Sequence, residues 1–167
     1  MSQLTRYRIR PLSPADQTFL WEMLYQSLYV PSGHALFERS ILKEPSIARY
    51  VAEWGRAGDC GFVAVDVDNL RVGAIWLRLL SGAEKGFGYV DEHTPELGMA
   101  VLPAYRGQGI GTSLLTQLIT LAAESYDQIC LSVAAENPAR GLYERFGFET
   151  VKVSGATLTM RKRLAVR

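Results

Sequence analysis

The sequence is poor in residues that cross-link small proteins or bind metals. It contains two cysteines and two histidines in 167 residues, and neither C-x-x-C nor H-x-x-x-H spacing occurs. This scarcity argues against a disulfide scaffold, and we expect no metal site. Cys60 and Cys130 lie within apolar runs, which favours two buried, reduced thiols.

An excess of one charge is also missing. There are 18 basic and 17 acidic residues, a net charge of +1, whereas nucleic-acid-binding proteins usually carry a basic excess. No apolar run approaches the roughly 18 residues of a membrane-spanning helix. The first residues also lack the apolar core of a signal peptide. We therefore expect a soluble, cytoplasmic protein that binds neither nucleic acid nor membrane.

What is present is the composition of an ordinary globular protein, with 48% hydrophobic and 21% charged residues. The length suits one domain with a core of its own. No repeat, linker or low-complexity segment divides the chain. We expect residues 1–167 to form a single domain.

The first third of the chain predicts one strand and two helices. Tyr7–Arg10 reads as a strand, and Ser13-Pro14 begins a helix because Ser caps well and Pro suits the first helical position. A second helix is entered through Pro45 and closed by Gly55. Its apolar stripe consists of Ile47, Tyr50, Val51 and Trp54.

The rest of the chain alternates between strand and helix patterns. Gly61–Val67 and Leu70–Leu79 predict a hairpin. The later elements are a strand at Leu97–Leu102, a helix from near Gly109, a strand at Ile129–Val133, a short helix from Asn137-Pro138, and strands at Val151–Val153 and Thr157–Arg163. The order predicts an α/β fold in which a mixed central β-sheet has helices on both faces, with a parallel pair in its middle.

A glycine-rich turn stands between the Leu97–Leu102 strand and the helix that follows. In Glu96–Thr112, ELGMAVLPAYRGQGIGT, the turn leads directly into a helix N-terminus, whose unpaired N–H groups attract anions. The spacing fits neither a P-loop nor a dinucleotide fingerprint, because no lysine follows Gly111 and the glycines stand at alternate positions. A connection that binds nothing is the alternative interpretation.

Two motifs resemble the GNAT superfamily of acetyl-CoA-dependent N-acetyltransferases. R-x-x-G-x-G at Arg106, Gly109 and Gly111 resembles the loop that binds the acetyl-CoA pyrophosphate. Asn137–Phe148, NPARGLYERFGF, is similar to the family's Asn…Tyr…Gly-Phe segment, although Gly141 falls near where a small apolar residue is usual. The resemblance implies an acyl-CoA N-acyltransferase-like fold with parallel strands that splay apart after Val101 and after Val133.

The resemblance also implies an acetyl-CoA site in the wedge between these strands. Backbone groups of one strand would pair with the pantetheine arm, and amides of the glycine turn would hold the pyrophosphate. Asn137 would contact the pantetheine or phosphate side, and a plain helix cap is its alternative. The expected acetyl-CoA contacts are Met99, Ala100, Val101, Arg106, Gly107, Gln108, Gly109, Ile110, Gly111, Thr112, Asn137 and Arg140.

Two residues are candidates for proton transfer. Tyr143 resembles the family's general acid, which protonates the leaving thiolate; a packed aromatic is the alternative. Glu96, at the start of the central strand, is the candidate base that accepts the amine proton, and a solvated strand-end charge is its alternative. Asp91, Glu92 and His93 could replace it through water. We expect direct transfer without an acyl-enzyme.

The acceptor is expected to be a small amine or an exposed peptide or protein amine. The aromatic and basic candidates for binding it are Tyr25, Tyr29, His34 and Tyr89. Two other functions remain open: an acyl-CoA-binding sensor without turnover, and a nucleotide-cofactor oxidoreductase. Proteins of this fold commonly form homodimers, but no residue of the sequence requires one.

Overall fold

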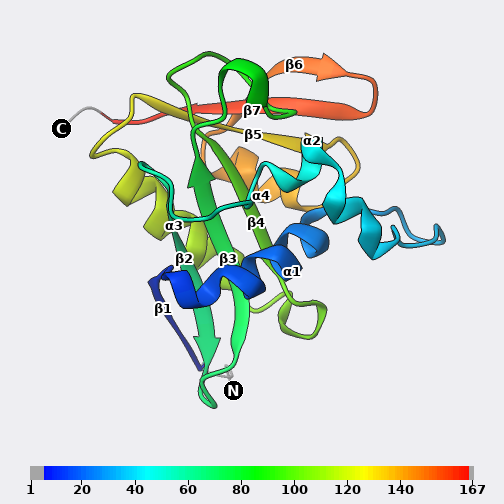
Figure 1. Ribbon diagram of the computed structural model, residues 1–167, viewed down its shortest axis with the longest axis vertical. Helices are drawn as coiled ribbons and strands as arrows, with labels where there is room; N and C mark the ends of the chain where they lie inside the picture. Colours follow the sequence, from blue (N-terminus) through cyan, green and yellow to red (C-terminus); the bar gives the residue numbers. More distant parts are fainter. Residues whose placement is uncertain (1–5, 166–167) are drawn as a thin grey trace.

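The computed structural model describes residues 6–165. Its seven strands form one sheet in the order β1-β2-β3-β4-β5-β7-β6 (Figure 1). The strands are β1 Tyr7–Pro11, β2 Cys60–Asp66, β3 Arg71–Arg78, β4 Glu96–Val101, β5 Gln128–Ala134, β6 Glu149–Ser154 and β7 Thr157–Arg163. β4 and β5 run parallel, and the other neighbours run antiparallel. The predicted mixed sheet is confirmed.

Helices cover both faces of this sheet, as predicted (Figure 1). They are α1 Gln17–Ser27, α2 Pro45–Ala48, α3 Ile110–Ala122 and α4 Ala139–Arg145. One core lies between the sheet and α3 and α4, and contains Leu114 and Phe148. A second core lies beneath α1 and α2, and contains Leu20 and Trp76. The sheet therefore buries apolar surface on both sides, which favours its assembly.

The second helix is shorter than its apolar stripe predicts. Regular α2 ends at Ala48, and turns continue the chain to Glu53. The reason is the side chain of Arg78, which donates to the carbonyls of Arg49 at 2.9 Å and Ala52 at 2.7 Å. A guanidinium from β3 thus satisfies carbonyls that another helical turn would have used.

The parallel strands β4 and β5 separate almost where they begin. The described parts of the two strands share one paired position, Glu96 with Cys130. The predicted splay is confirmed, but it starts at the first residue of β4 rather than after Val101. The loop before β4 lies against β5 just beyond that pair, because a Cβ on Gly88 would be 2.6 Å from the carbonyl carbon of Leu131.

Within residues 6–165, no helix has both the length and the apolar composition that crossing a bilayer requires. The same part of the chain contains no group of three His, Cys, Asp or Glu side chains arranged to hold a metal ion.

Candidate active site

The glycine turn after β4 forms an open approach to the N-terminus of α3. Gly107 and Gly109 have φ values of +76° and +83°, and a Cβ on either would find no atom within 4 Å. The Tyr7 hydroxyl secures the turn by donating to the Gly109 carbonyl at 3.2 Å, and it lies 2.6 Å from the Ser113 hydroxyl. Exposed backbone at a helix N-terminus fits a pyrophosphate group.

The turn adjoins two other segments that the sequence assigned to acetyl-CoA. Arg106 donates from Nε to the Val101 carbonyl at 3.0 Å, which holds its positive charge at the end of β4. A Cβ on Gly111 would be 3.5 Å from Leu142 in α4 and 3.7 Å from Met99 in β4. The structure therefore brings β4, the first turn of α3 and α4 together.

Asn137 and Arg140 both make contacts that stabilise α4. The Asn137 side-chain oxygen Oδ1 accepts the Ala139 N–H at 3.0 Å, a bond at the start of α4 that fits the helix-cap interpretation. Arg140 donates to Glu144 at 2.8 Å and to the Ala135 carbonyl at 3.4 Å. A role for either residue in binding acetyl-CoA stays a prediction.

Tyr143 lies in the core between the sheet and α3 and α4. Its side chain is 6% exposed, and its ring meets Phe148 edge to face with centroids 5.6 Å apart. Burial raises the pKa of the Tyr143 hydroxyl above its ordinary value, so the phenol keeps its proton at neutral pH. The packed-aromatic interpretation is therefore confirmed, and the role of Tyr143 as a general acid stays a prediction.

Glu96 begins β4 and is 3% exposed. Both of its carboxylate oxygens accept the Gly88 N–H at 3.2 Å, and Oε2 also accepts the Tyr50 hydroxyl. Burial raises the pKa of Glu96 to about 7, and the hydrogen bonds from Tyr50 and Gly88 oppose that rise. The interpretation as a solvated strand-end charge is therefore wrong, and the group is poised to take up a proton near neutral pH.

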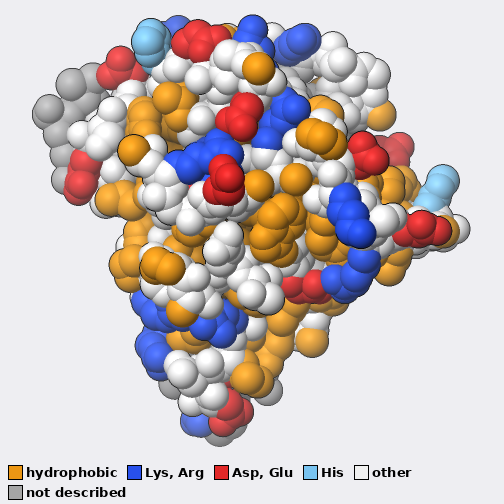
Figure 2. Space-filling model, viewed as in Figure 1, with side chains coloured by type: hydrophobic (Ala, Val, Ile, Leu, Met, Phe, Trp, Pro, Cys, Tyr) orange, Lys and Arg blue, Asp and Glu red, His pale blue; other side chains and the backbone are white. Residues whose placement is uncertain are grey.

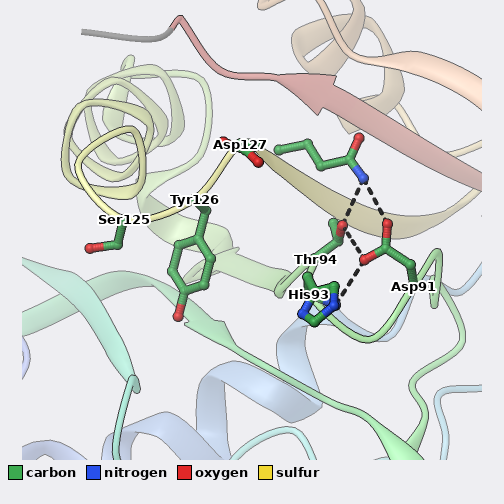
Figure 3. A pocket seen from close by; sticks show the side chains of 7 residues that line it. Asp91, His93, Thr94, Ser125, Tyr126 and Asp127 are labelled. Atoms are coloured by element: carbon green, nitrogen blue, oxygen red, sulfur yellow. Dashed lines mark hydrogen bonds between the residues drawn. The ribbon is translucent and has the colours of Figure 1, made fainter.

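The substitute carboxylates near Glu96 are engaged in other contacts. Asp91 accepts the His93 N–H and the Thr94 hydroxyl at 2.8 Å and the Gln128 amide at 3.0 Å. Figure 3 shows these bonds beside a polar pocket of about 280 Å³ at the start of β4 and β5. The pocket is lined by Asp91, His93, Thr94, Ser125, Tyr126, Asp127 and Gln128. The pocket lies at the opposite end of β4 from the glycine turn. The hydrogen bonds of Asp91 beside it fix the position where β4 begins.

The acceptor-binding candidates lie on two segments. Tyr25 in α1 donates to the Phe37 carbonyl at 2.6 Å, and its ring lies 4.3 Å from the Arg39 guanidinium carbon. Half-buried Tyr29 and exposed His34 follow in the segment after α1.

Tyr89 belongs to the loop before β4. It donates to Glu92 at 2.7 Å, and Lys85 lies 4.6 Å above its ring. The hydrogen bond to Glu92 raises the pKa of Tyr89 to about 12. In Figure 2, the face that carries α1 and α2 shows apolar side chains interspersed with both signs of charge.

Tyr50 is a residue of this site that the sequence pattern assigned to the core. Its position in an apolar stripe predicted packing, and it does pack beneath α2. Its hydroxyl nevertheless reaches Glu96 and accepts the Phe87 N–H at 2.8 Å. The available signal was chemical, because a buried tyrosine hydroxyl usually needs a hydrogen-bond partner.

Comparison with solved structures identifies the same architecture elsewhere. An acetyltransferase of the GNAT family from Staphylococcus aureus Mu50 superposes with a TM-score of 0.69 at 20% sequence identity. The superposition covers 95% of this chain and 99% of that chain. At this identity the similarity establishes the fold alone.

Two curated relatives are more similar in sequence over shorter regions. An N-alpha-acetyltransferase from Sulfolobus acidocaldarius is 32% identical over 114 residues, which is 62% of each chain. A ribosomal protein bS18 alanine N-acetyltransferase from Haemophilus influenzae is 41% identical over 65 residues, 38% of this chain and 44% of that protein. This chain therefore matches about three-fifths of the first relative's length and less than half of the second.

The family profile described as an acetyltransferase (GNAT) domain matches residues 50–150. This region runs from Tyr50 through Glu96 and the glycine turn to Tyr143 and the start of β6. Because the match covers more than half of the 167 residues, the chain belongs to the GNAT acetyltransferase family.

Proposed function

We propose that residues 1–167 act as one N-acetyltransferase domain that moves an acetyl group from acetyl-CoA to a primary amine by direct attack. The observation that supports this proposal is that two buried candidates for proton transfer, Glu96 and Tyr143, lie on opposite faces of the sheet. Glu96 meets Tyr50 on the side of α1 and α2, whereas Tyr143 lies in the core on the side of α3 and α4. A base and an acid on opposite faces suit an amine that enters from one side and a thiolate that leaves toward the other.

Acetyl-CoA supplies the activated acetyl group as a thioester. The residues of the glycine turn and the end of β4 would hold it, as the sequence resemblance implies. The amine nitrogen forms a bond to the acetyl carbon, and the carbon–sulfur bond breaks. Glu96 takes one proton from the ammonium and releases it to solvent, and a second proton passes from the nitrogen to solvent as the amide forms. Tyr143 protonates the thiolate and regains its proton from solvent, so one proton is released in all.

The pKa of Glu96 favours an α-amine as the acceptor. An N-terminal α-ammonium titrates near 8 and a lysine ammonium near 10.4. A carboxylate whose pKa burial has raised toward neutrality therefore deprotonates an α-ammonium more readily than a lysine ammonium. The relatives named for α-amine and alanine acetylation support the same substrate, the N-terminus of a peptide.

The first test is binding, measured by thermal unfolding with acetyl-CoA, CoA and NAD in parallel. A ligand at 100 times its dissociation constant adds about 2.7 kcal/mol, which is a shift of roughly 5–10 °C for a domain of this size. We expect a shift with both CoA species and none with NAD. A shift with NAD alone would favour the oxidoreductase.

The second test is turnover, followed by release of free thiol. The acceptors are a peptide with a free N-terminus, the same peptide with a blocked N-terminus and a lysine side chain, and spermidine. We expect acetylation of the free peptide only. Binding of acetyl-CoA without turnover of any acceptor would favour a sensor, and acetylation of spermidine alone would contradict the peptide substrate.

A further inference from the structure

We propose that Tyr50 is a positioning residue for the acetyl transfer, because its hydroxyl fixes the Glu96 carboxylate and joins it to the segment 86–88 that covers it. The inference rests on the proposed function, in which Glu96 is the base. It assigns a role to a residue outside the glycine turn and α4, the two segments that carry the family motifs.

The hydrogen bonds around Tyr50 form a chain with one direction. The Phe87 N–H donates to the Tyr50 oxygen at 2.8 Å, and the Tyr50 hydroxyl donates to Glu96 Oε2. The Gly88 N–H completes the arrangement by donating to both Glu96 oxygens at 3.2 Å. The carboxylate is therefore held by two donors, the Tyr50 hydroxyl and the Gly88 N–H, which come from two segments of the chain.

Tyr50 acts in this chain as a donor rather than as a base. Burial and the adjacent Glu96 carboxylate both raise the pKa of Tyr50 far above its ordinary value. The phenol therefore keeps its proton wherever the protein is folded. Its single proton points to Glu96, which leaves the oxygen lone pairs free to accept the Phe87 N–H.

The segment 86–88 packs closely against the Glu96 carboxylate and the Tyr50 hydroxyl. A Cβ on Gly86 would lie 2.3 Å from Glu96 Oε1 and 2.6 Å from the Tyr50 hydroxyl. The rings of Phe87 and Tyr50 are stacked, with centroids 6.3 Å apart and planes inclined by 13°. Gly86 is thus needed for the backbone to approach the carboxylate, and the stacked rings fix the direction of the phenol.

The charged groups packed around Glu96 bond to other partners, so Tyr50 is the main side chain that donates a hydrogen bond to the Glu96 carboxylate. Arg78, the register partner of Glu96 on β3, donates instead to Asp59 at 2.8 and 3.0 Å. Cys130 faces Glu96 from β5 as a buried thiol whose pKa is raised, so it is neutral. Asp91, in the preceding turn, is engaged with Thr94 and Gln128. Among the described residues, no cation contributes to the pKa of Glu96.

The test replaces Tyr50 with Phe, which removes the hydroxyl and keeps the ring. Because the lost donor stabilises the ionised carboxylate, the Glu96 midpoint should rise by about one to two pH units. The midpoint is read from the carboxyl carbon of Glu96 by ¹³C NMR, with Glu96→Gln to assign the signal. The acidic limb of the kcat profile should move by the same amount. Activity would then fall by roughly tenfold or more at pH 6.5 and recover above pH 9.

A fluorinated tyrosine at position 50 tests the opposite direction and preserves the packing. As a stronger hydrogen-bond donor it should lower the Glu96 midpoint. Tyr126→Phe is the matched control, since Tyr126 is a partly buried tyrosine just before β5 whose hydroxyl lies beside Gly58, and it should leave both profiles unchanged.

The outcomes separate this inference from the proposed function. Joint movement of the NMR midpoint and the kcat limb supports both. An unmoved NMR midpoint overturns the role of Tyr50, whatever the enzyme acetylates. A midpoint that moves while the kcat limb stays in place overturns Glu96 as the base, and with it any role of Tyr50 in the transfer.

Discussion

Arg78 and Glu96 face each other across β3 and β4, but the guanidinium is turned away from the carboxylate. Arg78 bonds to Asp59 and to two main-chain carbonyls, and all three of these acceptors precede β3 in the chain. An ion pair between Arg78 and Glu96 would have lowered the pKa of the carboxyl. Because Arg78 is used elsewhere, burial dominates, and Glu96 has a pKa near neutrality instead of a permanent charge.

Glu96→Gln should reduce kcat by of the order of 100-fold at pH 8, because the variant has no carboxylate to accept the amine proton. The wild-type profile should rise through about pH 7, and this acidic limb should be absent from the variant. The measurement is kcat from pH 5.5 to 9. The control is Glu124→Gln, an exposed carboxyl after α3. A full acidic limb in Glu96→Gln would assign the limb to another group.

The same carboxyl should make the protein less stable as the pH rises. The pKa of Glu96 is raised from 4.5 to about 7 by folding, so the folded state binds the extra proton between these values. The stabilising contribution of this proton is therefore fully present below pH 4.5 and is lost as the pH rises through about 7. The difference in the free energy of unfolding is of the order of 3 kcal/mol. Urea unfolding at pH 5 and pH 8 should show a smaller pH effect in Glu96→Gln than in the wild type.

Asp59→Asn should be strongly destabilising. The Arg78–Asp59 pair is buried, with side chains 2% and 3% exposed, so the variant leaves a buried guanidinium without its counter-charge. Breaking such a pair typically costs about 3–5 kcal/mol, or a fall in Tm of roughly 6–15 °C. Glu53→Gln is the control. It removes the carboxylate that pairs with Arg56, which is 83% exposed, and should change the free energy of unfolding by less than about 0.5 kcal/mol. Equal effects of the two variants would disprove the argument from burial.

Tyr143→Phe should lower kcat by roughly 10- to 1,000-fold while acetyl-CoA binds with nearly unchanged affinity. The reason is that the ring makes the packing contact with Phe148, and only the hydroxyl can protonate the thiolate. Single-turnover rates and calorimetric titration with acetyl-CoA separate these effects. Phe146→Leu, a packing change on the same helix end, serves as the control for indirect damage. An unchanged kcat would remove Tyr143 as the acid.

The sequence predicted the strands and the glycine turn because their signals are local. Short runs rich in Val, Ile, Phe and Trp mark the buried strands, and the Gly-rich turn before Ile110 marks the start of a helix. The end of α2 was not predictable in this way. It depends on Arg78, which lies 29 residues after Arg49 in the chain and reaches back to its carbonyl.

The same distinction between local signals and contacts of distant residues applies to the candidate site. Glu96 and Tyr143 could be proposed because they stand in or beside recognisable motifs, but the burial that raises the pKa of Glu96 comes with the loop at Gly88. Tyr50 was missed as a functional residue because its spacing is that of a core side chain. Spacing reports which face a side chain occupies, and only the folded structure shows what its polar atom meets.

Gly109→Ala and Gly141→Ala should change stability in opposite directions. Gly109 has φ +83°, where an L-residue costs about 1–2 kcal/mol, although its Cβ would have open space. Gly141 lies within α4, and its Cβ would meet only Arg145 at an ordinary 3.6 Å. Alanine should stabilise that helix by roughly 0.5–1 kcal/mol. Thermal unfolding without ligand should therefore show Tm falling for Gly109→Ala and rising for Gly141→Ala.

The same pair tests whether the turn binds acetyl-CoA. Strain at Gly109 should disturb the N–H groups at the start of α3, and we expect about tenfold weaker binding, or about 1.4 kcal/mol. Gly141→Ala adds a methyl group to the middle of α4 and should leave the affinity within about twofold. Calorimetric titration with acetyl-CoA and with CoA measures both variants. Since the two ligands share the pyrophosphate, Gly109→Ala must weaken both equally; a loss confined to acetyl-CoA would place the defect at the thioester instead of the turn.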